Sequence, residues 1–140
     1  MSVDLWKDFI VLIFFGSFVL TVFFLLTLQT ALERCSPECR TTSPGSVWGL
    51  LIPFYNVVWY FILVSKISES LHNEFAKRNI LEDIAPGKSL GIANGICQIC
   101  LSITMSTLGV YAFIASIICW TFYWVKISSY STKLSKPIAE

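Results

Sequence analysis

The sequence predicts an all-α integral membrane protein, a single membrane domain over residues 1–140 in which four transmembrane helices form a bundle. Of the 140 residues, 55% are hydrophobic and 14% are charged, against about 25% charged in ordinary soluble domains. Uncharged runs of 20 residues occur at 9–28 and 46–65, the length that an α-helix needs to cross about 30 Å of hydrocarbon. A third uncharged run, 89–125, is too long for one crossing, so we expect it to fold back on itself.

The run at 9–28 predicts the first transmembrane helix. It is longer than the apolar core of a secretory signal, and Asp4 and Asp8 outnumber Lys7 before it. We therefore expect this helix to be retained in the protein.

Cys35 and Cys39 lie in the polar connection that follows this helix. Their spacing lacks the C-x-x-C pattern of redox and metal sites, and no histidine is near. Two free thiols are the expected state, and a small-loop disulfide between them is the alternative if this connection faces an oxidising compartment.

The second transmembrane helix is expected at about 46–65. Pro53 removes one backbone donor inside this span, and Asn56 brings an amide that needs hydrogen-bond partners. Both residues are tolerable in a membrane only where protein or water satisfies these groups.

An amphipathic helix at 66–78 is expected to continue the second span into the cytosol. Its apolar positions Ile67, Leu71 and Phe75 are spaced by four, and Glu74 and Arg78 form an i,i+4 pair. The apolar face can lie on the lipid surface, dock against a partner or pack on the protein's own loops.

The third and fourth helices are expected at about 89–105 and 109–125, as a tight hairpin. Small and polar residues of the third helix recur at three- and four-residue steps and so share one face: Gly91, Asn94, Gly95, Gln98 and Ser102. A stripe of small residues on the fourth helix matches it: Ala112, Ala115, Ser116 and Cys119. The face can pack against the fourth helix within the hairpin, contact another chain, or line a polar pore together with Asn56.

With four crossings, both termini lie on one side of the membrane. Eight of the ten Lys and Arg residues then share that side, and Arg34 and Arg40 lie on the other. The positive-inside rule therefore predicts cytosolic N- and C-termini.

Several function classes are disfavoured by what the sequence lacks. The net charge of +1 and the scattered basic residues give no support to nucleic-acid binding. The predicted spans contain no ionisable Asp, Glu, Lys or Arg, which argues against a proton-coupled transporter. No catalytic motif or small-molecule substrate site is recognisable in the sequence. No metal or cofactor site is predicted either, because Cys97, Cys100 and Cys119 are better explained as packing residues.

The segments PGSVWGLLIPFYNVVWYF and VSKISESLHNEF resemble a pattern of small multipass bacterial inner-membrane proteins of unknown function. YWVKISSY, Tyr123 to Tyr130, resembles the end of the last helix in the same group. The resemblance covers about a third of the chain and implies an inner-membrane location but no activity, substrate or cofactor. The matching residues are Pro44, Gly45, Trp48, Pro53, Asn56, Trp59, Ser70, Leu71, Glu74 and Phe75.

The expected function is that of a non-enzymatic subunit, accessory protein or scaffold. It would act in the lipid bilayer through helix–helix association, either with itself or within a larger membrane complex. The alternative is a homo-oligomeric channel lined by Asn56, Asn94 and Gln98.

Overall fold

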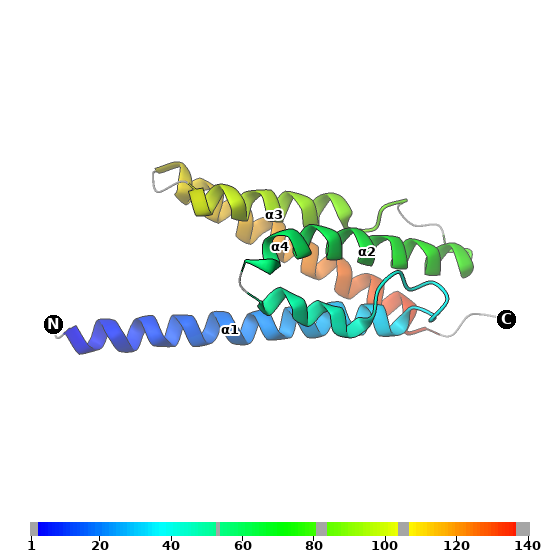
Figure 1. Cartoon of the computed structure of the whole chain (residues 1–140), viewed down its shortest axis with the longest axis horizontal. Helices are drawn as coiled ribbons and strands as arrows, with labels where there is room; N and C mark the ends of the chain where they lie inside the picture. Colours follow the sequence, from blue (N-terminus) through cyan, green and yellow to red (C-terminus); the bar gives the residue numbers. More distant parts are fainter. Residues whose placement is uncertain (1–2, 53, 81–83, 104–106, 137–140) are drawn as a thin grey trace.

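A computed structural model describes residues 3–52, 54–80, 84–103 and 107–136 of the chain. Within these ranges it contains five helices and no strands, which confirms the all-α class. In chain order the helices are α1 (Val3–Arg34), η1 (Pro44–Leu51), α2 (Tyr55–Lys77), α3 (Lys88–Ile103) and α4 (Thr107–Leu134). Figure 1 shows α1 extending beyond the other helices at its N-terminal end.

The predicted helix at 46–65 is corrected by the structure, which divides this segment into η1 and the first half of α2. η1 is a 3-10 helix of eight residues, and at about 2 Å per residue it spans about 16 Å, half of a bilayer core. Phe54 then takes a left-handed φ of 65° and is 94% exposed, so the chain turns at this point and α2 runs back beside η1 (Figure 1). Pro53 lies outside the described residues.

Trp59 explains why this hairpin closes. Its indole Nε1 donates a hydrogen bond to the carbonyl oxygen of Ser46 at 2.9 Å, from α2 to η1. The ring lies so close to Gly49 that a Cβ at that position would be 2.9 Å from Nε1. Glycine is therefore required where the two segments meet, and a straight helix through 46–65 would lose both contacts.

Two helices, α1 and α4, are long and apolar enough to cross a membrane. Only 11% and 17% of their most apolar windows are buried in the protein, unlike the core helices of a soluble fold. In its second half α1 also contributes Phe24, Leu25 and Leu28 to the core. Within the described residues α2 and α3 do not pass the same test, so the structure supports a membrane location but gives no support to four crossings.

The end of the chain is more ordered than the sequence indicated. We expected the fourth helix to end at about residue 125, but α4 continues to Leu134. Ile127, Tyr130 and Leu134 recur at steps of three and four, and all three side chains are buried against the core. This apolar stripe, which is interspersed with serines and lysines, keeps the last two turns helical.

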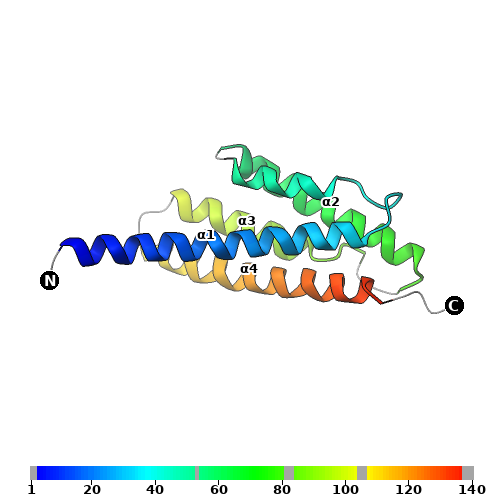
Figure 2. The same cartoon turned by 90° about the horizontal axis from the view of Figure 1, so that it is seen from below.

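The N-terminal end of α1 and the C-terminal end of α4 lie at opposite ends of the long axis (Figures 1 and 2). The expected placement of both termini on one side assumed that 46–65 crosses the membrane. In the structure η1 and α2 enter and leave the bundle at the same end, and α1, α3 and α4 then run along the long axis in turn, so the two ends of the chain lie apart.

We call the two ends of the molecule the basic half and the apolar half. The basic half comprises the C-terminal parts of α1, α2 and α4, the connection 35–43 and the start of α3. It holds every Lys and Arg except Lys7: Arg34, Arg40, Lys66, Lys77, Arg78, Lys88, Lys126, Lys133 and Lys136. The apolar half comprises the N-terminal part of α1, the η1–α2 turn and the facing ends of α3 and α4.

Candidate functional site

Glu74 is the centre of the polar contacts in the basic half. Its side chain is 1% exposed. It accepts hydrogen bonds from the backbone N–H of Ser36 at 2.7 Å, the Ser36 hydroxyl at 3.2 Å and Nε of Arg78 at 2.7 Å. Arg78 in turn donates to the carbonyl oxygens of Leu134 at 3.0 Å and Lys136 at 3.3 Å. One carboxylate therefore joins the 35–43 connection, α2 and the end of α4.

The pKa of Glu74 depends on the balance between burial and hydrogen bonding. Burial alone would raise the pKa of this carboxyl, but the hydrogen bonds from Ser36 and Arg78 together outweigh burial and hold the pKa below its ordinary value of 4.5. Glu74 is therefore a structural anion, stabilised in its charged form by three donors.

The amphipathic face predicted at Ile67, Leu71 and Phe75 packs inside the protein. All three side chains are buried in the core, and the ring of Phe75 contacts Tyr130 of α4 with 5.4 Å between centroids. On the next face of α2, the Ser70 hydroxyl accepts from the backbone N–H of Thr41. Of the three roles considered for this face, the structure shows packing on the protein's own elements.

The disulfide considered as the alternative for Cys35 and Cys39 is not formed in the structure, where both are free, buried thiols. Cys35 donates to the carbonyl oxygen of Ala31 at 3.4 Å. Burial, with the nearby Glu74 charge, raises the pKa of Cys35 to about 12. Burial and Glu74 also raise the pKa of Cys39. Both thiols are therefore poor nucleophiles, because the thiolate is the reactive form.

The polar face predicted on α3 is divided by the structure. Asn94 is completely buried, donates to the Tyr60 hydroxyl at 2.9 Å and accepts from the Ser116 hydroxyl at 3.2 Å. It thus joins α2, α3 and α4 at the middle of the bundle.

Gly91 and Gly95 lie on the same buried face and allow α2 to approach α3. A Cβ on Gly91 would meet Val64 at 2.5 Å, and one on Gly95 would meet Phe61 at 2.7 Å. The G-x-x-x-G pair thus contacts α2, whereas Ser116 of the expected α4 stripe reaches Asn94.

Asn56, Gln98 and Ser102 are exposed and do not join this cluster. The Ser102 hydroxyl donates to the carbonyl oxygen of Gln98 at 2.9 Å, within its own helix. The side-chain amides of Asn56 and Gln98 make no hydrogen bond to any described residue. Of the three amides considered as a pore lining, Asn94 is therefore buried between helices, whereas Asn56 and Gln98 lie separately on the surface.

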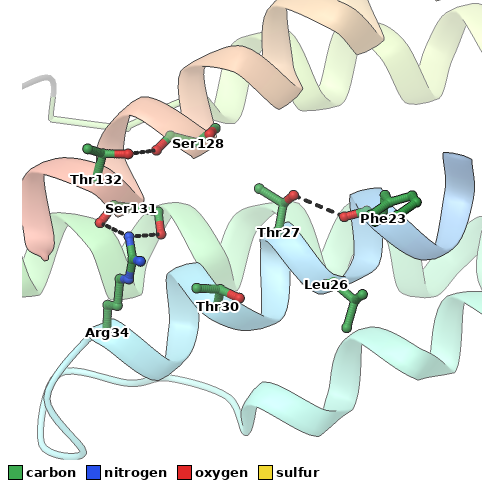
Figure 3. Close-up of a pocket in the computed structure, with 8 residues that line it drawn as sticks. All are labelled: Phe23, Leu26, Thr27, Thr30, Arg34, Ser128, Ser131 and Thr132. Atoms are coloured by element: carbon green, nitrogen blue, oxygen red, sulfur yellow. Dashed lines mark hydrogen bonds between the residues drawn. The ribbon is translucent and has the colours of Figure 1, made fainter.

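An open groove of about 290 Å³ lies between α1 and α4 in the basic half. It could not be predicted from the sequence, because its residues come from helices far apart in the chain. Arg34 reaches across it, and its Nη1 donates to the Ser131 carbonyl oxygen at 2.6 Å and to the Ser131 hydroxyl at 3.0 Å (Figure 3). The lining residues are Phe23, Leu26, Thr27, Thr30, Arg34, Ser128, Ser131 and Thr132.

Among the described residues there is no group of three His, Cys, Asp or Glu side chains that could hold a metal ion. No family model, no curated protein and no solved structure matches the chain.

Proposed function

We propose that the chain is a non-enzymatic integral membrane protein that acts through helix–helix association, with a second copy of itself or within a larger membrane complex. The exposed surface supports the membrane location. In α1 the side chains from Leu5 to Phe18 are exposed and, apart from Lys7 and Asp8, almost entirely apolar, and Phe14 is 78% exposed. Water would disfavour this surface, whereas hydrocarbon accepts it. The bacterial inner membrane is proposed from the sequence resemblance.

The distribution of charge supports a revised orientation, with the basic half in the cytosol and the N-terminus outside. Nine of the ten Lys and Arg residues are in the basic half, against Lys7 near the opposite end. Fluorescent and enzymatic topology reporters fused to each terminus test this. The C-terminal fusion should report the cytosol and the N-terminal fusion the exterior, and two fusions that report the same side would contradict the orientation.

Gln98 carries the proposal of association. It is exposed among apolar side chains of α3, with Ile96 and Ile103 also exposed, and its amide has no partner among the described residues. An amide in hydrocarbon without hydrogen bonds is unfavourable by about 2 kcal/mol or more. A helix from another chain can supply the missing partners, and interhelical hydrogen bonds of this kind contribute about 1 kcal/mol in membranes.

Native mass spectrometry and crosslinking of the purified protein in mild detergent test the association. We expect a dimer or higher oligomer, or a partner that copurifies. Gln98→Leu should weaken this association by about fivefold, the factor that corresponds to about 1 kcal/mol.

Thr121→Val is the matched control, because it also removes a polar group from an exposed helix face. The Thr121 hydroxyl already donates to Ile117 of its own helix at 2.8 Å, so this variant should associate as the unmodified protein does. A protein that is strictly monomeric without a copurifying partner, or equal effects of the two variants, would contradict the proposal.

A further inference from the structure

We infer that the groove between α1 and α4 binds the phosphate headgroup of an anionic phospholipid. The groove lies between the two helices that can cross a membrane, at the level where both sequences change from apolar to charged. Phe23 and Leu26 line it toward the apolar half, and Arg34, Ser131 and Thr132 line it toward the basic half (Figure 3). This order, apolar and then cationic along one groove, matches the order of acyl chain and headgroup in a phospholipid.

The groove offers hydrogen-bond donors that the protein itself does not use. Arg34 uses Nη1 for Ser131, whereas its Nε and Nη2 contact no acceptor among the described residues. The Thr30 and Ser128 hydroxyls likewise have no partner in the described part of the chain. None of the described residues that line the groove is acidic. A set of free donors around a guanidinium, without a carboxylate, selects an anion.

The geometry of Arg34 favours direct contact with a phosphate group over a long-range electrostatic attraction to an anionic surface. Its contact with Ser131 fixes the guanidinium across the groove, so little side-chain entropy remains to be lost on binding. Trp124 adds a second link between the same helices, because its Nε1 donates to the Thr27 hydroxyl at 2.9 Å. The volume of about 290 Å³ fits a headgroup, while the acyl chains would lie outside, along Phe23 and the exposed face of α1.

Lipid titrations monitored by native mass spectrometry test this site on the full-length protein in mild detergent. The probes are phosphatidylglycerol and phosphatidylcholine with identical acyl chains, and inorganic phosphate. We expect phosphatidylglycerol to bind more tightly than phosphatidylcholine. Arg34→Gln should weaken phosphatidylglycerol binding about tenfold, as loss of a charge-assisted hydrogen bond predicts.

Arg40→Gln is the matched control. Arg40 is in the same half, but its guanidinium donates to the carbonyl oxygens of Cys35 and Glu33, away from the groove. This variant should bind phosphatidylglycerol as the unmodified protein does. Equal binding of the two lipids, or equal effects of the two arginine variants, would overturn the site.

A second variant keeps the test valid if Arg34→Gln does not fold. Thr30→Val with Ser128→Ala removes two free hydroxyls and leaves the contact between Arg34 and Ser131 intact. It should weaken phosphatidylglycerol binding several-fold, and unchanged affinity would overturn the inference. Displacement of the lipid by an equal concentration of inorganic phosphate would also overturn it, because the acyl chains would then contribute nothing.

The inference depends on the proposed membrane location but not on association between helices. A monomer that binds phosphatidylglycerol selectively would support the lipid site and contradict the association. An oligomer without lipid preference would do the reverse.

Discussion

In the basic half, hydrogen bonds to charged side chains join three helices and the 35–43 connection, whereas in the apolar half most side chains of α1 are exposed. Glu74 and Arg78 have five hydrogen bonds between them, four of which leave α2 for other segments. Phe9, Val11 and Phe15 of α1 are each more than half exposed. The difference indicates that the basic half fixes the fold and that the apolar half presents a surface to the surroundings.

Removing the central carboxylate should have the largest effect on stability. Glu74→Ala leaves the Ser36 donors and the Arg78 guanidinium without their acceptor, and we expect the free energy of unfolding to fall by about 3 kcal/mol. Thermal unfolding in detergent, followed by tryptophan fluorescence, measures it. Glu38→Ala is the control, because Glu38 is exposed and pairs with the exposed Lys77 at 3.2 Å, and no measurable change is expected. Similar changes in the two variants would contradict the central role of Glu74 in holding the basic half together.

The same carboxylate should make stability depend on pH. The pKa of Glu74 is lower in the folded protein than its ordinary value of 4.5, so the folded state binds its proton less readily than the unfolded state. The stabilisation by Glu74 is therefore complete above about pH 4.5 and is lost as the pH falls through the pKa of Glu74 in the folded protein. Melting temperatures measured between neutral and acidic pH should fall less steeply for Glu74→Gln than for the unmodified protein. Parallel curves would contradict the assignment.

Two glycines in the same sequence should respond to alanine with opposite signs. At Gly91 an added Cβ would lie 2.5 Å from Val64, a buried branched side chain with little room to move, so Gly91→Ala should destabilise the protein by about 2 kcal/mol. At Gly16, in α1, nothing lies within 4 Å. Gly16→Ala should be neutral or stabilise the helix by up to about 1 kcal/mol. Thermal unfolding of both variants is the measurement, and a loss of stability in Gly16→Ala would show that this part of α1 is packed.

The all-α class could be predicted from the sequence because long uncharged runs and steps of three and four residues are local patterns. The interhelical role of Gly91 and Asn94 followed from the same spacing, although the sequence did not show that α2, as well as α4, contacts this face. The course of 46–65 could not be predicted, because hydropathy does not distinguish one crossing from a turn between two shorter helices. The expected placement of both termini on one side of the membrane depended on that crossing.

The contacts of the basic half could not be predicted from the sequence either. Glu74 and Arg78 were recognisable as an i,i+4 pair on the surface of a helix, and nothing local shows that Ser36 lies against them. Ser36 is 38 residues away in sequence from Glu74, and Ser131 is 97 from Arg34. The burial of Cys35 and Cys39 depends on the same distant contacts. Their spacing could indicate a disulfide but could not indicate the neighbouring carboxylate.

The smallest expected effect is at the boundary between the two halves, where Trp59 links η1 to α2. Trp59→Phe keeps an aromatic ring against Gly49 but removes the hydrogen bond to Ser46, so stability should fall by about 1 kcal/mol. Trp48→Phe also removes an indole donor, but its bond to Gln29 is exposed and should contribute less. Near-ultraviolet circular dichroism and thermal unfolding compare the two. If Trp59→Phe were the more stable variant, the η1–α2 turn would be held by its surroundings in the membrane and not by the packing of the basic half.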